Sequence, residues 1–131
     1  MNHSLKAIIA NCKRPSKASA DTCSDLEKKY NFSLAADLKF LYEHFFGGFV
    51  ITETGEQVNF FTLHTLIYDA EELLSVSVKE TRLLPIIDLN DGNFVFYHIE
   101  DKSYRCQNLI DEICIYKTLE LKEILQYICV I

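Results

Sequence analysis

The chain has 131 residues, a length that fits one domain of about 100–200 residues. Apolar residues make up 49% and charged residues 24%, a globular balance that excludes disordered, collagen-like and coiled-coil proteins. The 13 basic and 19 acidic residues give a net charge of −6. That charge argues against a nucleic-acid-binding protein, because such proteins carry a basic patch.

The charge is distributed unevenly along the sequence. Residues 1–20 contain four basic residues and no acid, whereas the remaining 111 residues contain 9 basic and 19 acidic ones, for a net charge of −10. We therefore divide the chain into a basic N-terminal arm, residues 1–20, and a single domain, residues 21–131. An acidic domain favours a fast encounter with a basic partner; a merely solvated acidic surface is the alternative.

The cysteines and histidines show no pattern of a disulfide scaffold or a metal site. The five cysteines are odd in number and include no C-x-x-C pair, and the four histidines lie far apart. Zinc sites need paired Cys or His residues at short spacing. We interpret the cysteines as small core residues in a reducing compartment and expect no metal or other cofactor. The apolar runs are shorter than the ~20 residues that cross a bilayer, so we expect a cytoplasmic protein without membrane contact.

Two helices are predicted first. Residues 21–30 place apolar side chains at helical spacing, with Ser24 and Glu27 as a capping box. Residues 34–46 do the same, with Ser33 as the N-cap. The pair Gly47 and Gly48 is predicted to end this second helix, because glycine readily adopts the left-handed conformation found at helix ends.

The rest of the chain is predicted to be mostly β-structure. Strands are expected at 49–52 and 58–63, a short helix capped by Asp69 at 70–74, and an antiparallel meander with strands at 84–89, 94–99 and 104–109. Pro85 stands near a strand start, where proline is tolerated, and Gly92 belongs to an Asp-Gly turn. Thr118 is the predicted cap of a last helix at 119–129. The expected fold is α+β, an antiparallel sheet with two N-terminal helices and one C-terminal helix packed against it.

No short catalytic signature is present. The glycine pair follows a helix, whereas a phosphate-binding loop would precede one. Cys106 and His98 lie on neighbouring predicted strands, so a Cys/His enzyme site is one hypothesis. Several carboxylates flank the predicted turns, where Asp side chains bind backbone N–H groups. An acidic face for a basic partner is the alternative reading of these carboxylates.

The order of several short motifs resembles the SUKH superfamily. The matching segments are SDLEKKYNFSL at 24–34, DLKFLY at 37–42, the glycine pair at 47–48, LPI at 84–86 and DGNFVFY at 91–97. This resemblance covers roughly residues 21–129. It implies a non-enzymatic binding domain, because bacterial members are mostly immunity proteins that neutralise a cognate toxin, often a nuclease. Fungal relatives are regulators of cell-wall synthesis, so an intracellular regulatory adaptor is the alternative function.

The resemblance leads to an expected mechanism, namely occlusion of a basic toxin surface. Nucleases have basic clefts for phosphates, and an acidic inhibitor is attracted to such a cleft. The candidate partner-binding residues are the acids at predicted turns: Glu53, Glu56, Asp91, Glu100, Asp101, Asp111 and Glu112. The expected partner is a basic protein, with no nucleic acid bound.

Overall fold

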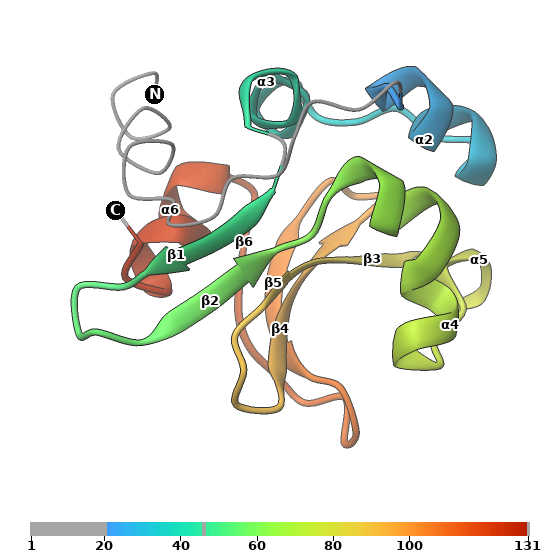
Figure 1. Ribbon diagram of the computed structural model, residues 1–131. Helices are drawn as coiled ribbons and strands as arrows, with labels where there is room; N and C mark the ends of the chain where they lie inside the picture. The colour runs from blue at the N-terminus through green and yellow to red at the C-terminus, as the bar shows by residue number, and fades with distance from the viewer. Residues whose placement is uncertain (1–20, 46, 131) are drawn as a thin grey trace.

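The computed structural model describes residues 21–45 and 47–130, and the predicted basic arm lies outside them. The first half contains α2 (Cys23–Tyr30), α3 (Ala36–His44), β1 (Gly48–Ile51), β2 (Gln57–Phe60), the π-helix η1 (Thr65–Asp69), α4 (Ala70–Leu74) and α5 (Val78–Thr81). The second half contains β3 (Leu83–Asp88), β4 (Asn93–His98), β5 (Tyr104–Asn108), β6 (Cys114–Thr118) and α6 (Leu121–Tyr127) (Figure 1).

The strands form one antiparallel sheet in the order β1-β2-β3-β4-β5-β6, so each strand pairs with the next along the chain. The predicted α+β fold with an antiparallel meander is confirmed. The register of β3 and β4 shifts between Pro85 and Ile87. Pro85 therefore lies at an irregularity within β3 rather than at its start, which suits a residue that lacks a backbone N–H.

Helix α3 is connected to the sheet and to α6 by three polar contacts. The N–H of Ala35 donates to the Tyr97 hydroxyl at 2.9 Å, and the Tyr104 hydroxyl donates to Oδ1 of Asp37 at 2.6 Å. The N–H of Leu121 donates to Oδ2 of the same carboxylate at 3.1 Å. Because Tyr97 and Tyr104 are fully buried, these contacts satisfy hydroxyl groups that would otherwise be left without partners.

The helix caps differ from the sequence prediction. Thr22, not Ser24, is the N-cap of α2, and its reciprocal partner in the capping box is Asp25. Helix α3 begins after Ala35 with no side-chain cap, so the prediction of Ser33 was wrong. The loop before α3 is held from α2 instead, because the Leu34 N–H donates to the Glu27 carboxylate at 2.8 Å.

The glycine pair leads into β1 rather than closing α3, because Gly48 is the first residue of the strand and Gly47 directly precedes it. The helix ends at His44, and its C-cap, Phe45, has extended backbone angles. Gly47 has φ = +103° and Gly48 has φ = +128°, a region that favours glycine. A Cβ on Gly47 would lie 2.9 Å from Cγ2 of Thr62. The pair therefore permits the close approach of the chain to the end of β2.

Three elements were not predicted. The π-helix η1 and the short α5 lie in the connection between β2 and β3. Strand β6 was also missed, and as a result α6 was predicted to begin too early. Thr118 is the last residue of β6, where its hydroxyl accepts the Glu120 N–H at 3.2 Å and donates to Glu123 at 2.6 Å.

Candidate functional site

The topology of the sheet gathers five of the seven candidate acids at one end. In an uninterrupted antiparallel meander, alternate turns lie at the same end of the sheet. The β1–β2, β3–β4 and β5–β6 turns, residues 52–56, 89–92 and 109–113, therefore lie together, and we call them the hairpin end. The five acids, all exposed, are Glu53, Glu56, Asp91, Asp111 and Glu112.

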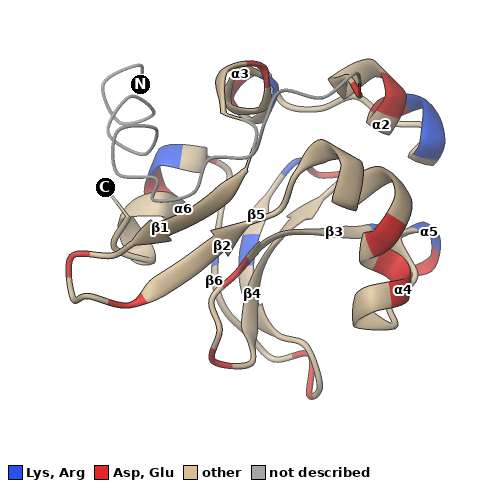
Figure 2. Ribbon diagram, in the orientation of Figure 1, with Lys and Arg blue, Asp and Glu red and all other residues tan. Residues whose placement is uncertain are grey.

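The hairpin end has no basic residue to compensate its charge. Its three turns contain no Lys or Arg, and Figure 2 shows acidic positions at their tips without basic ones. Asp91 and Asp111 each accept a backbone N–H at 3.0 Å, from Asn93 and Ile113. Within residues 21–45 and 47–130, none of the five acids forms an ion pair.

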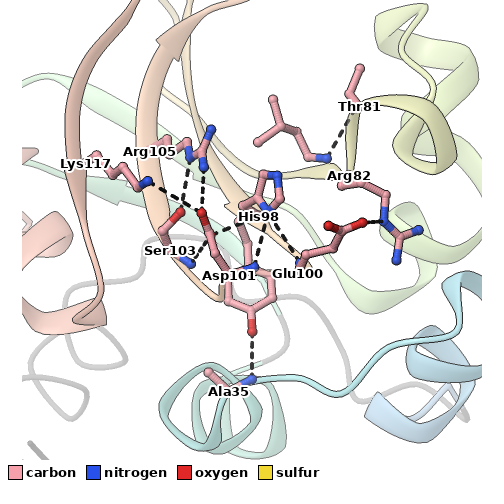
Figure 3. A network of polar contacts seen from close by, with 11 residues as sticks. Ala35, Thr81, Arg82, His98, Glu100, Asp101, Ser103, Arg105 and Lys117 are labelled. Carbon is pink, nitrogen blue, oxygen red and sulfur yellow. Dashed lines mark hydrogen bonds and ion pairs between the residues drawn. The ribbon is translucent and has the colours of Figure 1, made fainter.

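Glu100 and Asp101 lie in the β4–β5 turn, at the opposite end of the sheet. Figure 3 shows that both face cations. Nε of Arg82 is 2.8 Å from Oε1 of Glu100. Oδ2 of Asp101 is 2.8 Å from Nη2 of Arg105 and 3.5 Å from Nζ of Lys117. These two candidates are separated from the hairpin end and are largely neutralised within the chain.

The β4–β5 turn is held by its own side chains. Nδ1 of His98 is 3.3 Å from the backbone N atoms of Glu100 and Asp101, and accepts their N–H groups. Partial burial acts to raise the pKa of Asp101, but hydrogen bonds from Ser103 and the nearby positive charges outweigh it and hold the pKa well below its ordinary value. Asp101 therefore stays ionised and has a structural role in this turn.

The hypothetical Cys/His enzyme site is not formed by Cys106 and His98. Cys106 pairs with Val95, three residues before His98, which corresponds to a separation of about 10 Å along the strand. Burial, with a smaller effect of Asp91, raises the pKa of the Cys106 thiol to about 11. The thiol is therefore protonated at neutral pH, a state in which cysteine is a poor nucleophile.

Exposed isoleucines accompany the acids at the hairpin end, and the sequence reasoning missed them. Ile110 is 91% exposed, Ile113 58% and Ile115 52%. Two of them lie in the β5–β6 turn and the third in the edge strand β6. The register of β5 and β6 shifts between Cys106 and Gln107, which leaves Ile115 as the extra residue of a bulge. The continuous apolar run Ile-Cys-Ile-Tyr at 113–116, rich in β-branched and aromatic residues, was the signal that could have revealed this strand.

No candidate cluster of metal ligands and no candidate membrane-spanning helix occurs in the part of the chain that the structure describes. It holds no group of three or more His, Cys, Asp or Glu side chains placed to bind a metal ion. In the same part of the chain, no helix has the length and apolar character needed to span a membrane.

These features define the class of protein. It is an α+β protein in which helices pack on an antiparallel meander and the turns of the hairpin end are acidic. Residues 17–127 match the model of the SMI1 / KNR4 family (SUKH-1), so the chain belongs to that family. The resemblance noted in the sequence is thereby confirmed. No curated protein matches this sequence.

Proposed function

We propose that this chain is a protein-binding domain of the immunity type, which binds a basic toxin through the hairpin end and neutralises it by occlusion. The observation that supports the proposal is the presence of five exposed acids in three neighbouring turns without a compensating cation. Family membership is consistent with an immunity or a regulatory role.

The physical argument concerns both the rate and the strength of binding. A surface of one sign raises the association rate of an oppositely charged partner by about 10- to 1,000-fold at low salt. Ile110 and Ile113, which protrude beside the acids, would be buried in the complex and contribute apolar area. The combination fits a partner whose binding face is basic, as a cleft that binds nucleic-acid phosphates is, and that also presents apolar side chains.

The experiment is co-expression of the chain with the toxin encoded beside its gene, scored as bacterial growth, together with binding kinetics of the purified pair. We expect growth to be restored and binding to weaken as salt is added. If no neighbouring toxin is neutralised and none binds, the proposed function is wrong.

A matched pair of variants tests whether the hairpin end is the binding surface. One variant replaces Glu53, Glu56 and Glu112 by Gln, and the control replaces the equally exposed Glu43, Glu72 and Glu80 by Gln. Both change the net charge by the same amount. We expect the association rate to fall about tenfold or more in the first variant and much less in the control. Equal losses in the two variants would contradict the assignment of the surface.

A further inference from the structure

A groove of about 440 Å³ opens at the hairpin end, within the range of about 300–1,000 Å³ typical of ligand sites. It is lined by residues from the β1–β2 and β3–β4 turns, from β2, β4, β5 and β6, and from the end of α6. Val58 and Cys106 are 2% and 1% exposed and so form its floor. Ile115 and Tyr127 are 52% and 43% exposed and stand at its margin.

Two carboxylates define the charge of this groove. Glu56 and Asp91 are among its lining residues, and the lining contains no Lys, Arg or His. The same two acids, with Leu89, also line an adjoining depression of about 500 Å³. The two hollows therefore adjoin at Glu56 and Asp91, and both carboxylates face the region where they meet.

The floor of the groove is uncharged. The Cys106 thiol remains neutral because burial raises its pKa to about 11. Cys129, at the other side, directs its Sγ to the carbonyl of Tyr127 at 3.8 Å. Asp91 raises the pKa of the Cys106 thiol further rather than lowering it, and the lining contains no histidine that could act as a base for either thiol.

The ring of Tyr127 is held in place at the margin of the groove. It stacks on Tyr116 with a centroid distance of 4.2 Å and an interplanar angle of 6°. An aromatic ring fixed on one side and partly exposed on the other favours a cation that approaches its free face. Arginine satisfies such a site better than lysine, because the flat guanidinium stacks on rings and binds carboxylates through two N–H groups.

We propose that this groove receives an arginine from an apolar segment of the partner protein. The aliphatic part of the arginine packs on Ile115, and its guanidinium stacks on the Tyr127 ring with its N–H groups directed to Glu56 and Asp91. This inference rests on the proposed function in one respect, that the partner presents a basic surface. It goes further in naming the residue type and the groove that recognises it.

The test uses a defined probe and needs no knowledge of the partner. The peptide acetyl-Leu-Arg-Leu-amide is titrated into the full ¹⁵N-labelled chain, and amide chemical shifts are followed by NMR. The matched probe is acetyl-Leu-Gln-Leu-amide, which keeps the apolar residues and removes the charge. We expect the arginine peptide to shift amides of the β1–β2 turn, the β3–β4 turn and residues 127–129. The glutamine peptide should bind at least about tenfold more weakly.

Two variants locate the recognition. Replacing Glu56 by Gln and Asp91 by Asn should abolish the preference for arginine. Replacing Glu53 and Glu112 by Gln, which removes the same charge from the hairpin end outside the groove, should leave the preference largely intact. Equal binding of the two peptides, shifts confined to other surfaces, or equal effects of the two variants would overturn the proposal.

Other occupants give different results in the same experiment. If the groove amides shift with protein concentration before peptide is added, a second copy occupies the groove. If replacing Arg14 by Gln changes the chemical shifts of the groove amides in the absence of peptide, the chain's own N-terminal segment is the occupant. Either result refutes the proposal that the groove receives an arginine from a partner. Selective binding of the arginine peptide in the groove, without neutralisation of any toxin, would support the arginine site and refute the proposed function. A toxin that is neutralised but does not contact the groove would support the proposed function and refute the arginine site.

Discussion

Asp37 offers a sharp test of how the fold is held together. Its carboxylate accepts the buried Tyr104 hydroxyl at 2.6 Å and the Leu121 N–H at 3.1 Å. It also accepts the Leu38 N–H at 2.7 Å. Helix α6 has no side-chain cap from its own N-cap residue, Glu120, so Asp37 takes that role from a distant helix. Asp37→Ala removes all of these acceptors at once.

The magnitude follows from the groups left without partners. An orphaned buried hydroxyl costs about 1–3 kcal/mol, and Tyr104 is 0% exposed. Burial first, and then Asp37, raise the Tyr104 pKa well above its ordinary value, so the hydroxyl stays protonated and needs an acceptor. Loss of a helix cap costs about 1 kcal/mol more. We therefore expect Asp37→Ala to lower the free energy of unfolding by about 2–4 kcal/mol.

Urea denaturation at pH 7, followed by circular dichroism, measures this free energy directly. For a domain of this size each kcal/mol corresponds to about 4 °C in Tm. The melting temperature should therefore fall by roughly 8–16 °C. Asp69→Ala is the matched control, because the Asp69 side chain makes no cap hydrogen bond, and it should change stability by about 0.5 kcal/mol or less.

A double-mutant cycle with Tyr104→Phe separates the hydroxyl from other effects. The double variant has no orphaned hydroxyl, so its destabilisation should be smaller than the sum of the single ones by at least about 1 kcal/mol. Additive losses, or a loss below about 1 kcal/mol in Asp37→Ala, would refute the role assigned to this carboxylate.

Further predictions concern the backbone, acid stability and the thiols. Gly47→Ala should destabilise more in urea than Gly55→Ala: both have positive φ, but only Gly47 would place a methyl group 2.9 Å from a threonine side chain. Partial burial would raise the pKa of Asp101, but hydrogen bonds and cations lower it below 3.8. The stability it contributes is therefore present above about pH 4 and lost as the pH falls further; Asp101→Asn should flatten the loss of stability measured between pH 4 and 2. Alkylation at pH 8, read by mass spectrometry, should modify the exposed Cys114 and spare the buried Cys106 until the chain unfolds.

The main elements of the fold could be predicted because their patterns are local. Apolar spacing identified α2 and α3, and an Asp-Gly turn between apolar runs identified β3 and β4. Caps were less predictable, since several Ser, Thr and Asp residues compete near each helix start. Thr22 was preferred over Ser24 through its reciprocal bond with Asp25, and α6 is capped by Asp37, which is 84 positions away.

The candidate site was predictable only in part. The acids were identified from composition and turns, but their grouping depends on the number of strands. Because β6 was not predicted, Asp111 and Glu112 were expected in a loop whose position relative to the sheet could not be predicted. With β6, they occupy a hairpin turn at the same end as Glu56 and Asp91. The ion pair of Glu100 with Arg82 joins positions 18 apart, and no local pattern predicts such a contact.

The two ends of the sheet therefore differ in how much their side chains contribute to the stability of the fold. Three structural features lie at the end of the sheet opposite the hairpin turns. They are the turn that contains Asp101, the bond between Tyr104 at the start of β5 and Asp37, and the start of α6. Substitutions there break buried or cross-element bonds. The glutamates of the hairpin end, Glu53, Glu56 and Glu112, are exposed and form no ion pair within residues 21–45 and 47–130, so replacing one should cost about 0.5 kcal/mol or less. Under the proposed function, changes confined to the exposed glutamates of these turns would alter the partner-binding surface while the buried bonds at the opposite end of the sheet stay intact.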